Sequence, residues 1–115
     1  MLNQILLSGN LGDDPKMFYS SEGKGIVSFS LAFHSGKDKT GWIKVTCFNR
    51  LAEITEKYLH KGARIAIIGI LDQQKWEDEN GNSKSSFQVI ANTLEFIKTD
   101  GRGFEEGQKD GDLPF

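Results

Sequence analysis

The chain has 115 residues, of which 37% are hydrophobic and 26% charged, enough for one domain with a single core and too polar for a membrane protein. No stretch approaches the ~20 apolar residues of a membrane span, and the N-terminal residues lack the basic opening and apolar run of a signal peptide. The lone Cys47 has no internal disulfide partner, which agrees with a reducing compartment. We therefore expect a cytoplasmic protein with no membrane partner.

The first elements predicted along the chain are strands. Residues 3–9 (NQILLSG) indicate a strand, and residues 26–33 (IVSFSLAF) alternate apolar and polar side chains with the period of two typical of a strand. The glycines in residues 20–25 (SSEGKG) predict a hairpin turn before that second strand. The alternation places Val27, Phe29, Leu31 and Phe33 on one face of this strand and Ser28, Ser30 and Ala32 on the other.

One segment, residues 50–62 (RLAEITEKYLHKG), has the apolar spacing of a helix. Asn49 is the expected N-cap and Gly62 the expected C-terminal stop. The predicted buried stripe is Leu51, Ile54, Tyr58 and Leu59, and the predicted solvent-facing residues are Glu53, Glu56, Lys57 and Lys61.

Two further strands are predicted after the helix. Residues 63–71 (ARIAIIGIL) are apolar in both phases, so we expect cover on both faces from the helix or from another subunit. The Asn-Gly pair in residues 77–83 predicts a hairpin turn that leads into a strand at residues 85–97. Three strands, one helix and two strands are the element order of the OB-fold, a five-stranded Greek-key barrel, so the predicted class of residues 1–98 is all-β with one helix.

The acidic residues gather at the C-terminus. Residues 1–98 contain 12 Lys and Arg against 11 Asp and Glu, a charge of +1, and residues 99–115 contain 2 against 5, a charge of −3. This second segment is rich in glycine and has no apolar periodicity. We predict a disordered acidic tail.

The predicted strand at residues 41–48 (GWIKVTCF) carries the main functional signal. One phase, Ile43, Val45 and Cys47, is an ordinary core set. The other phase places Trp42 and Phe48 beside Lys44 and Thr46, and rings interleaved with a cation form a surface on which nucleobases stack. Trp76 precedes the second hairpin turn, where an arm could project it beyond the barrel. The alternative is that these rings cover the open side of the barrel or lie in a subunit interface.

The sequence shows little sign of catalysis. His34 and His60 are far apart, and one cysteine gives no metal-ligand spacing. Asp13 and Asp14 precede a proline as turn-forming residues do, although a nuclease would pair them with Asp38 around Mg²⁺. With no nucleophile and base pair and no phosphate loop, we expect no enzyme, no cofactor and no metal.

Four stretches resemble the bacterial single-stranded DNA-binding protein (SSB) family: residues 10–15 (NLGDDP), 41–62, 74–81 (QKWEDENG) and 110–115 (DGDLPF). The resemblance implies an OB-fold that usually forms a homotetramer and wraps single-stranded DNA. It also implies a mobile acidic tail that recruits replication, recombination and repair enzymes. The alternative is an OB-fold primosome or assembly module that binds protein rather than DNA.

The resemblance assigns roles to individual residues. Trp42, Phe48 and Trp76 match the base-stacking aromatics. Lys44, Arg50, Lys61 and Lys75 fall at or beside its phosphate-facing positions. Lys37 and Lys39 lie in a short loop, residues 34–40 (HSGKDKT), where the family often carries a further stacking Trp, and we expect them to contact phosphate as well. The expected partner-binding tip is Asp110, Asp112, Leu113, Pro114 and Phe115.

The chain also departs from the family pattern. Asp72, Gln74 and Phe18 stand where the family tends to carry arginine, so a weaker electrostatic grip on DNA is expected. Ile43 replaces a histidine that helps the tetramer cohere, which leaves a dimer open beside the tetramer.

Overall fold

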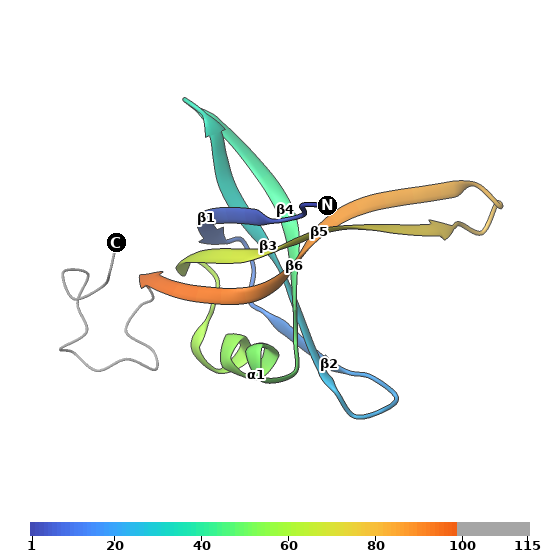
Figure 1. The fold of residues 1–115 in the computed structure, drawn as a ribbon, viewed down its shortest axis with the longest axis horizontal. Coiled ribbons are helices and arrows are strands. Elements are labelled where there is room, and N and C mark those ends of the chain that lie inside the picture. The colour runs from blue at the N-terminus through green and yellow to red at the C-terminus, as the bar shows by residue number, and fades with distance from the viewer. Residues whose placement is uncertain (99–115) are drawn as a thin grey trace.

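The computed structural model describes residues 1–98, which form six strands and one helix (Figure 1). This confirms the predicted class. Within these residues, no helix has the length and apolar character that crossing a membrane requires. The elements are β1 (Ile5–Leu11), β2 (Lys16–Tyr19), β3 (Gly25–Gly36), β4 (Lys39–Phe48), α1 (Asn49–Tyr58), β5 (Arg64–Glu77) and β6 (Ser83–Lys98).

The strands close into a barrel. Their order is β1-β5-β6-β4-β3-β2, and β1 also pairs with β3, which joins the two ends of the sheet. Strands β4 and β6 run parallel, and the other pairs are antiparallel. Both β1 and β2 pair with β3, so they act as two halves of one barrel strand interrupted at residues 12–15. The predicted five-stranded OB-fold is therefore confirmed, although β2 was not predicted.

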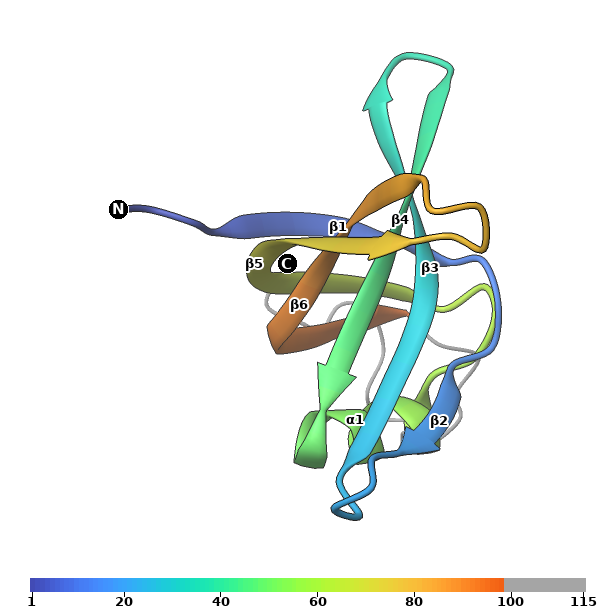
Figure 2. The same cartoon turned by 90° about the vertical axis from the view of Figure 1, so that its right-hand side faces the viewer.

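The core lies inside the barrel, and α1 packs against β3 and β4 at one end (Figures 1 and 2). Val27, Phe29 and Leu31 are buried, as the alternation of β3 predicts. The helix departs from its predicted stripe because Ala52 and Thr55 are its most buried residues. Their short side chains let the helix approach the sheet closely. Of the predicted stripe, Leu59 is buried and Leu51, Ile54 and Tyr58 are half-buried.

Both predicted helix ends are wrong in detail. The cap is Phe48, and none of the described side chains caps the first turn. Asn49 is instead the first helical residue, and its φ is 57° because β4 turns directly into the helix. Asparagine tolerates such a positive φ better than most residues. The helix ends at Tyr58, and Leu59, in an extended conformation, is its C-cap. Gly62, with a φ of 92°, directs the chain into β5, and its N–H donates to the Leu11 carbonyl at 2.9 Å.

Three hairpins project from the barrel (Figures 1 and 2). The β2–β3 hairpin confirms the turn predicted at residues 20–25. The segment 34–40 lies mostly in strands rather than in a loop, because β3 and β4 pair almost to their junction and leave only residues 37–38 between them. Strands β5 and β6 continue past the barrel as a long arm, which confirms the predicted position of Trp76 on a projecting hairpin.

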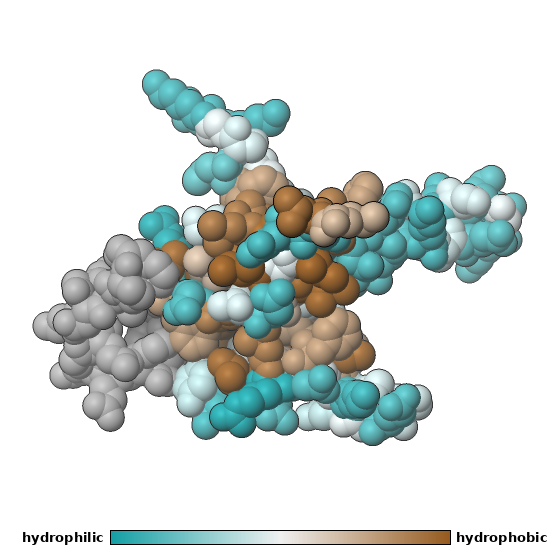
Figure 3. Space-filling view, in the orientation of Figure 1, coloured by the Kyte–Doolittle hydropathy of each residue, from teal (hydrophilic) through white to brown (hydrophobic). Residues whose placement is uncertain are grey.

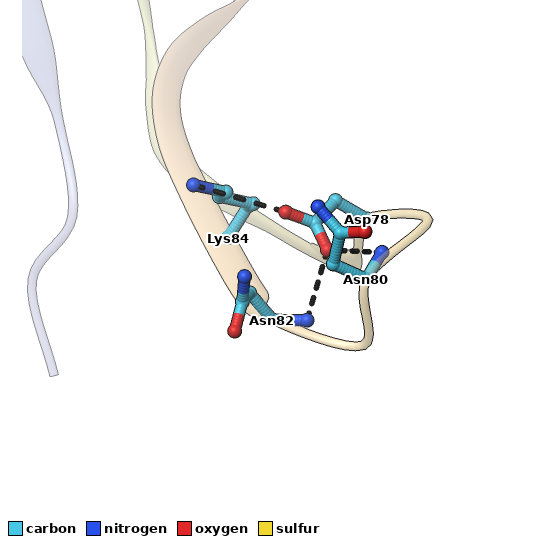
Figure 4. A network of polar contacts seen from close by, with 4 residues as sticks. All are labelled: Asp78, Asn80, Asn82 and Lys84. Atoms are coloured by element: carbon cyan, nitrogen blue, oxygen red, sulfur yellow. Dashed lines mark hydrogen bonds and ion pairs between the residues drawn. The ribbon is translucent and has the colours of Figure 1, made fainter.

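Asp78 organises the turn at the end of the arm (Figure 4). One carboxylate oxygen accepts from the backbone N–H groups of Asn80 and Asn82, both at 2.9 Å, and the other lies 3.9 Å from the Lys84 ammonium. Gly81 takes a φ of 80°, as the predicted Asn-Gly turn requires. The turn therefore holds the two strands of the arm in register.

Strand β5 is buried on one face, and within residues 1–98 the helix does not supply the predicted cover of the other. Ile65 and Ile67 are fully buried in the core. On the opposite face Ile68 is half-buried and Ile70 is exposed, and both lie near the exposed Leu6 of β1, the partner of Ile68. Within residues 1–98 the helix covers neither, because it packs on β3 and β4. Cover by a second subunit stays a prediction.

Candidate nucleic-acid interface

The outer side of β4 carries the predicted rings. Trp42 is 62% exposed and Phe48 41%, and the exposed Lys44 lies between them. Val45 and Cys47, in the other phase, are fully buried. In the space-filling view, apolar side chains gather in the middle of the visible face, between polar projections (Figure 3). The alternation predicted for β4 is therefore confirmed for the two rings and Lys44, although Thr46, in the same phase as the rings, is buried.

The Trp42 ring rests on the backbone of Gly12. A Cβ atom at Gly12 would lie only 2.2 Å from Cζ3 of the ring. The Gly12 N–H donates to the Ser30 carbonyl at 2.8 Å, and Asp13 accepts from the Ser30 N–H at 3.0 Å. This link between β1 and β2 is thus fixed to β3 and forms a floor under one side of Trp42, while the exposed part of the ring remains available for stacking.

A third ring, Phe18, joins this surface. In the strand register Phe18 of β2 is opposite Ile26 of β3, which in turn is opposite Phe48 of β4. Residues paired directly across strands point to the same side of the sheet. Phe18 is 58% exposed, and sequence reasoning missed it because the four residues of β2 are too few to show a period. We call the outer surface that carries Phe18, Trp42, Lys44 and Phe48 the aromatic face.

The arm contributes the fourth ring. Trp76 is 49% exposed, and its partner across the arm is Lys84, which was not predicted as a site residue. Alternation along β5 places Lys75 on the other side of the arm, opposite Ser85. Lys75, Trp76 and Lys84 nevertheless border one open hollow. A base stacked on Trp76 therefore has lysines nearby on both strands of the arm.

The predicted basic residues are only partly gathered. Lys44 lies within the aromatic face. Arg50 is in the first turn of α1, two residues after Phe48. Lys37 and Lys39 lie at the end of the β3–β4 hairpin. Lys61 lies between α1 and β5, and its backbone N–H donates to the Asp14 carboxylate at 2.7 Å.

These side chains are open to solvent. Lys37, Lys39, Lys44, Arg50, Lys61 and Lys75 are all exposed, and within residues 1–98 none of them forms an ion pair. Their charges are therefore available to phosphate groups. The residues predicted for the partner-binding tip, Asp110, Asp112, Leu113, Pro114 and Phe115, lie outside the described residues.

A chain of hydrogen bonds lies beside the aromatic face. The Thr46 hydroxyl donates to Oε1 of Gln88 at 2.6 Å, and Nε2 of Gln88 donates to Oδ2 of Asp72 at 2.9 Å. The three side chains come from β4, β6 and β5. They fix a carboxylate at one position on a surface that otherwise carries rings and lysines.

Nowhere in residues 1–98 do three or more His, Cys, Asp or Glu side chains gather in a way that could hold a metal ion. Burial raises the pKa of the Cys47 thiol to about 11, although a hydrogen bond with Thr55 acts in the opposite direction. This thiol is therefore protonated at neutral pH and hidden in the core.

Comparisons with known proteins identify a family and a solved structure to which this chain is similar. Residues 2–97 match the model of the single-strand binding protein family. A solved structure described as a Plasmodium falciparum SSB complex with ssDNA has 27% sequence identity and a TM-score of 0.77. The match covers 85% of this chain and 97% of that one. Because the family model spans nearly all of the described barrel, the chain belongs to the single-strand binding protein family.

Proposed function

We propose that this protein binds single-stranded DNA through the aromatic face and the arm, largely independently of sequence. The observation that carries the proposal is the set of exposed rings, Phe18, Trp42 and Phe48, on one face beside Lys44, which forms no ion pair within residues 1–98. Any base can stack on such a ring, and a lysine can contact any phosphate. Membership of the family and the similarity to an SSB–ssDNA complex support it.

The geometry favours single strands over duplexes. A base can stack on Trp42 only if its face is free, and in a duplex both faces are covered by neighbouring base pairs. The arm extends the surface, so a strand that leaves the aromatic face can continue to Trp76 and Lys84. Duplex DNA should therefore bind much more weakly, through charge alone.

The titration that tests this proposal uses intrinsic fluorescence. Trp42 and Trp76 are the two tryptophans of the chain, so quenching during addition of oligo(dT) reports directly on stacking. We expect strong quenching by oligo(dT) and little by a duplex of equal length, and Trp42→Ala should remove part of the signal. An unchanged spectrum at low salt would instead support the protein-binding assembly module.

The cellular role and assembly extend the same proposal. We propose a cytoplasmic protein that protects single-stranded DNA during replication, recombination and repair. We further propose a homotetramer ahead of a dimer, supported by the partly uncovered outer face of β5. A monomer by light scattering at micromolar concentration would contradict this assembly.

The tail is proposed to recruit partner enzymes. The acidic and apolar residues at 110–115 suit a pocket with a hydrophobic floor and basic walls. Deleting residues 113–115 should abolish retention of replication and repair enzymes in a pull-down and leave affinity for oligo(dT) equal or slightly tighter. Retention of the same partners by the truncated protein would refute the role of the tip.

A further inference from the structure

A row of polar side chains continues the aromatic face across the barrel. Lys44 on β4 is the register partner of Gln88 on β6, and Gln88 is the partner of Asp72 on β5. Thr46 lies two residues beyond Lys44 on the same side of β4. Because paired residues point to the same side of a sheet, Asp72 belongs to the surface that carries Trp42.

The hydrogen bonds hold the Asp72 carboxylate in one orientation. Gln88 is buried, and its amide accepts from the Thr46 hydroxyl and donates to Asp72. A flipped amide would set Oε1 against the carboxylate, and these are two acceptors with no hydrogen between them. The bond to the charged group is also stronger than a neutral one. Among residues 1–98, the other carboxylate oxygen, Oδ1, has no partner, and the Asp72 side chain is only half-buried.

We propose that Asp72 discriminates between bases by accepting a hydrogen bond from an exocyclic amino group, and so favours cytosine over thymine at this point of the bound strand. The inference rests on the proposed function. An ionised carboxylate can only accept. Cytosine presents its N4 amino group as a donor, whereas thymine presents the acceptor O4 in the same place. The result is a base preference within an otherwise sequence-independent interface.

The position of Asp72 suits a base better than a phosphate. A carboxylate repels phosphate groups, and Lys44, two strands away across β6, is the cation that can attract them. Two strand spacings correspond to about 10 Å. A nucleotide whose phosphate contacts Lys44 can therefore direct the edge of its base toward Asp72 while its negative charge stays away from the carboxylate.

The experiment compares oligo(dC) with oligo(dT) of equal length. Dissociation constants are measured for the full chain and for Asp72→Asn, at one salt concentration and at slightly alkaline pH so that cytosine stays unprotonated. The readout is the ratio Kd(dT)/Kd(dC), in which the effects of overall charge cancel. We expect Asp72→Asn to lower this ratio roughly fivefold. The side-chain oxygen of the asparagine still accepts from Gln88. The new amino group therefore occupies the position of Oδ1, where it cannot accept from cytosine and so disfavours that base.

Two further variants sharpen the result. Glu79→Gln removes an equal charge at the exposed turn of the arm, and its ratio should match that of the unsubstituted protein. Thr46→Val keeps the Asp72 charge but releases the Gln88 amide, so its ratio should fall partway. Should Asp72→Asn fail to fold by circular dichroism, the ratio for Thr46→Val decides.

The possible outcomes separate the two levels of the proposal. If Asp72→Asn tightens binding of both oligonucleotides equally and the ratio is unchanged, Asp72 acts through charge alone. The inference is then wrong, while the proposed function stands. If the unsubstituted protein binds neither oligonucleotide, the proposed function fails and the inference with it.

Discussion

Replacing Gly12 with alanine should weaken single-strand binding, because the new Cβ would displace the ring of Trp42. The new Cβ would lie 2.2 Å from Cζ3 of Trp42 and 3.0 Å from Cη2. Carbon atoms in contact prefer separations of about 3.5–4.0 Å, so the ring must move by about 1.5 Å. The backbone at Gly12 cannot retreat easily because its N–H is bonded to the Ser30 carbonyl.

The size of the effect follows from the binding free energy contributed by one base stacked on one ring. Removing a ring that stacks on a base typically weakens binding by about 1–3 kcal/mol. A displaced ring retains part of that contact, so we expect a loss of about 1 kcal/mol, or roughly fivefold in Kd. The barrel should remain folded, because Gly12 does not have a positive φ and Trp42 is largely exposed.

A double-mutant cycle measures whether Gly12 acts through Trp42. Affinities for a fluorescently labelled oligo(dT) are measured by anisotropy for Gly12→Ala, Trp42→Ala and the double variant. If Gly12 affects binding only by supporting the Trp42 ring, Gly12→Ala should have no further effect once Trp42 is alanine. Gly36→Ala is the matched control, since a Cβ there meets nothing within 4 Å. Additive losses would refute the reasoning, as would unchanged affinity in Gly12→Ala.

Three other expectations can be checked with the same protein. Phe18→Ala should weaken oligo(dT) binding by about 1–3 kcal/mol, whereas the adjacent Tyr19→Ala, on the other face of β2, should not; equal losses would remove Phe18 from the interface. With about four phosphate contacts, log K should fall against log[salt] with a slope on the order of −3, and Lys44→Ala, but not Lys24→Ala, should reduce it by about 0.7; a slope near zero would exclude phosphate contacts. Because burial raises the Cys47 pKa to about 11 from 9.0 in the unfolded chain, its contribution to stability is complete below pH 9 and is lost as the pH rises toward 11. Urea unfolding should show up to about 3 kcal/mol of alkaline destabilisation that Cys47→Ala lacks, and identical pH profiles would contradict this.

Local patterns were enough to predict much of this protein. The period of two in β4 separated Trp42 and Phe48 from the buried Val45 and Cys47, because successive side chains of any strand point to opposite faces. The Asn-Gly turn likewise predicted the arm and the position of Trp76, since few dipeptides adopt that turn so readily. Each of these features depends on residues close together in the chain.

What only the tertiary structure decided depends on register between distant strands. Phe18 meets Phe48 across Ile26, Gly12 lies beneath Trp42, and Gln88 joins Thr46 to Asp72. No local pattern encodes these neighbours, because closing the barrel sets the offset between strands, and a shift of one residue would turn every side chain to the other face. The sequence by itself determined which face of β4 carries the rings, and barrel closure decided which residues of the other strands surround them.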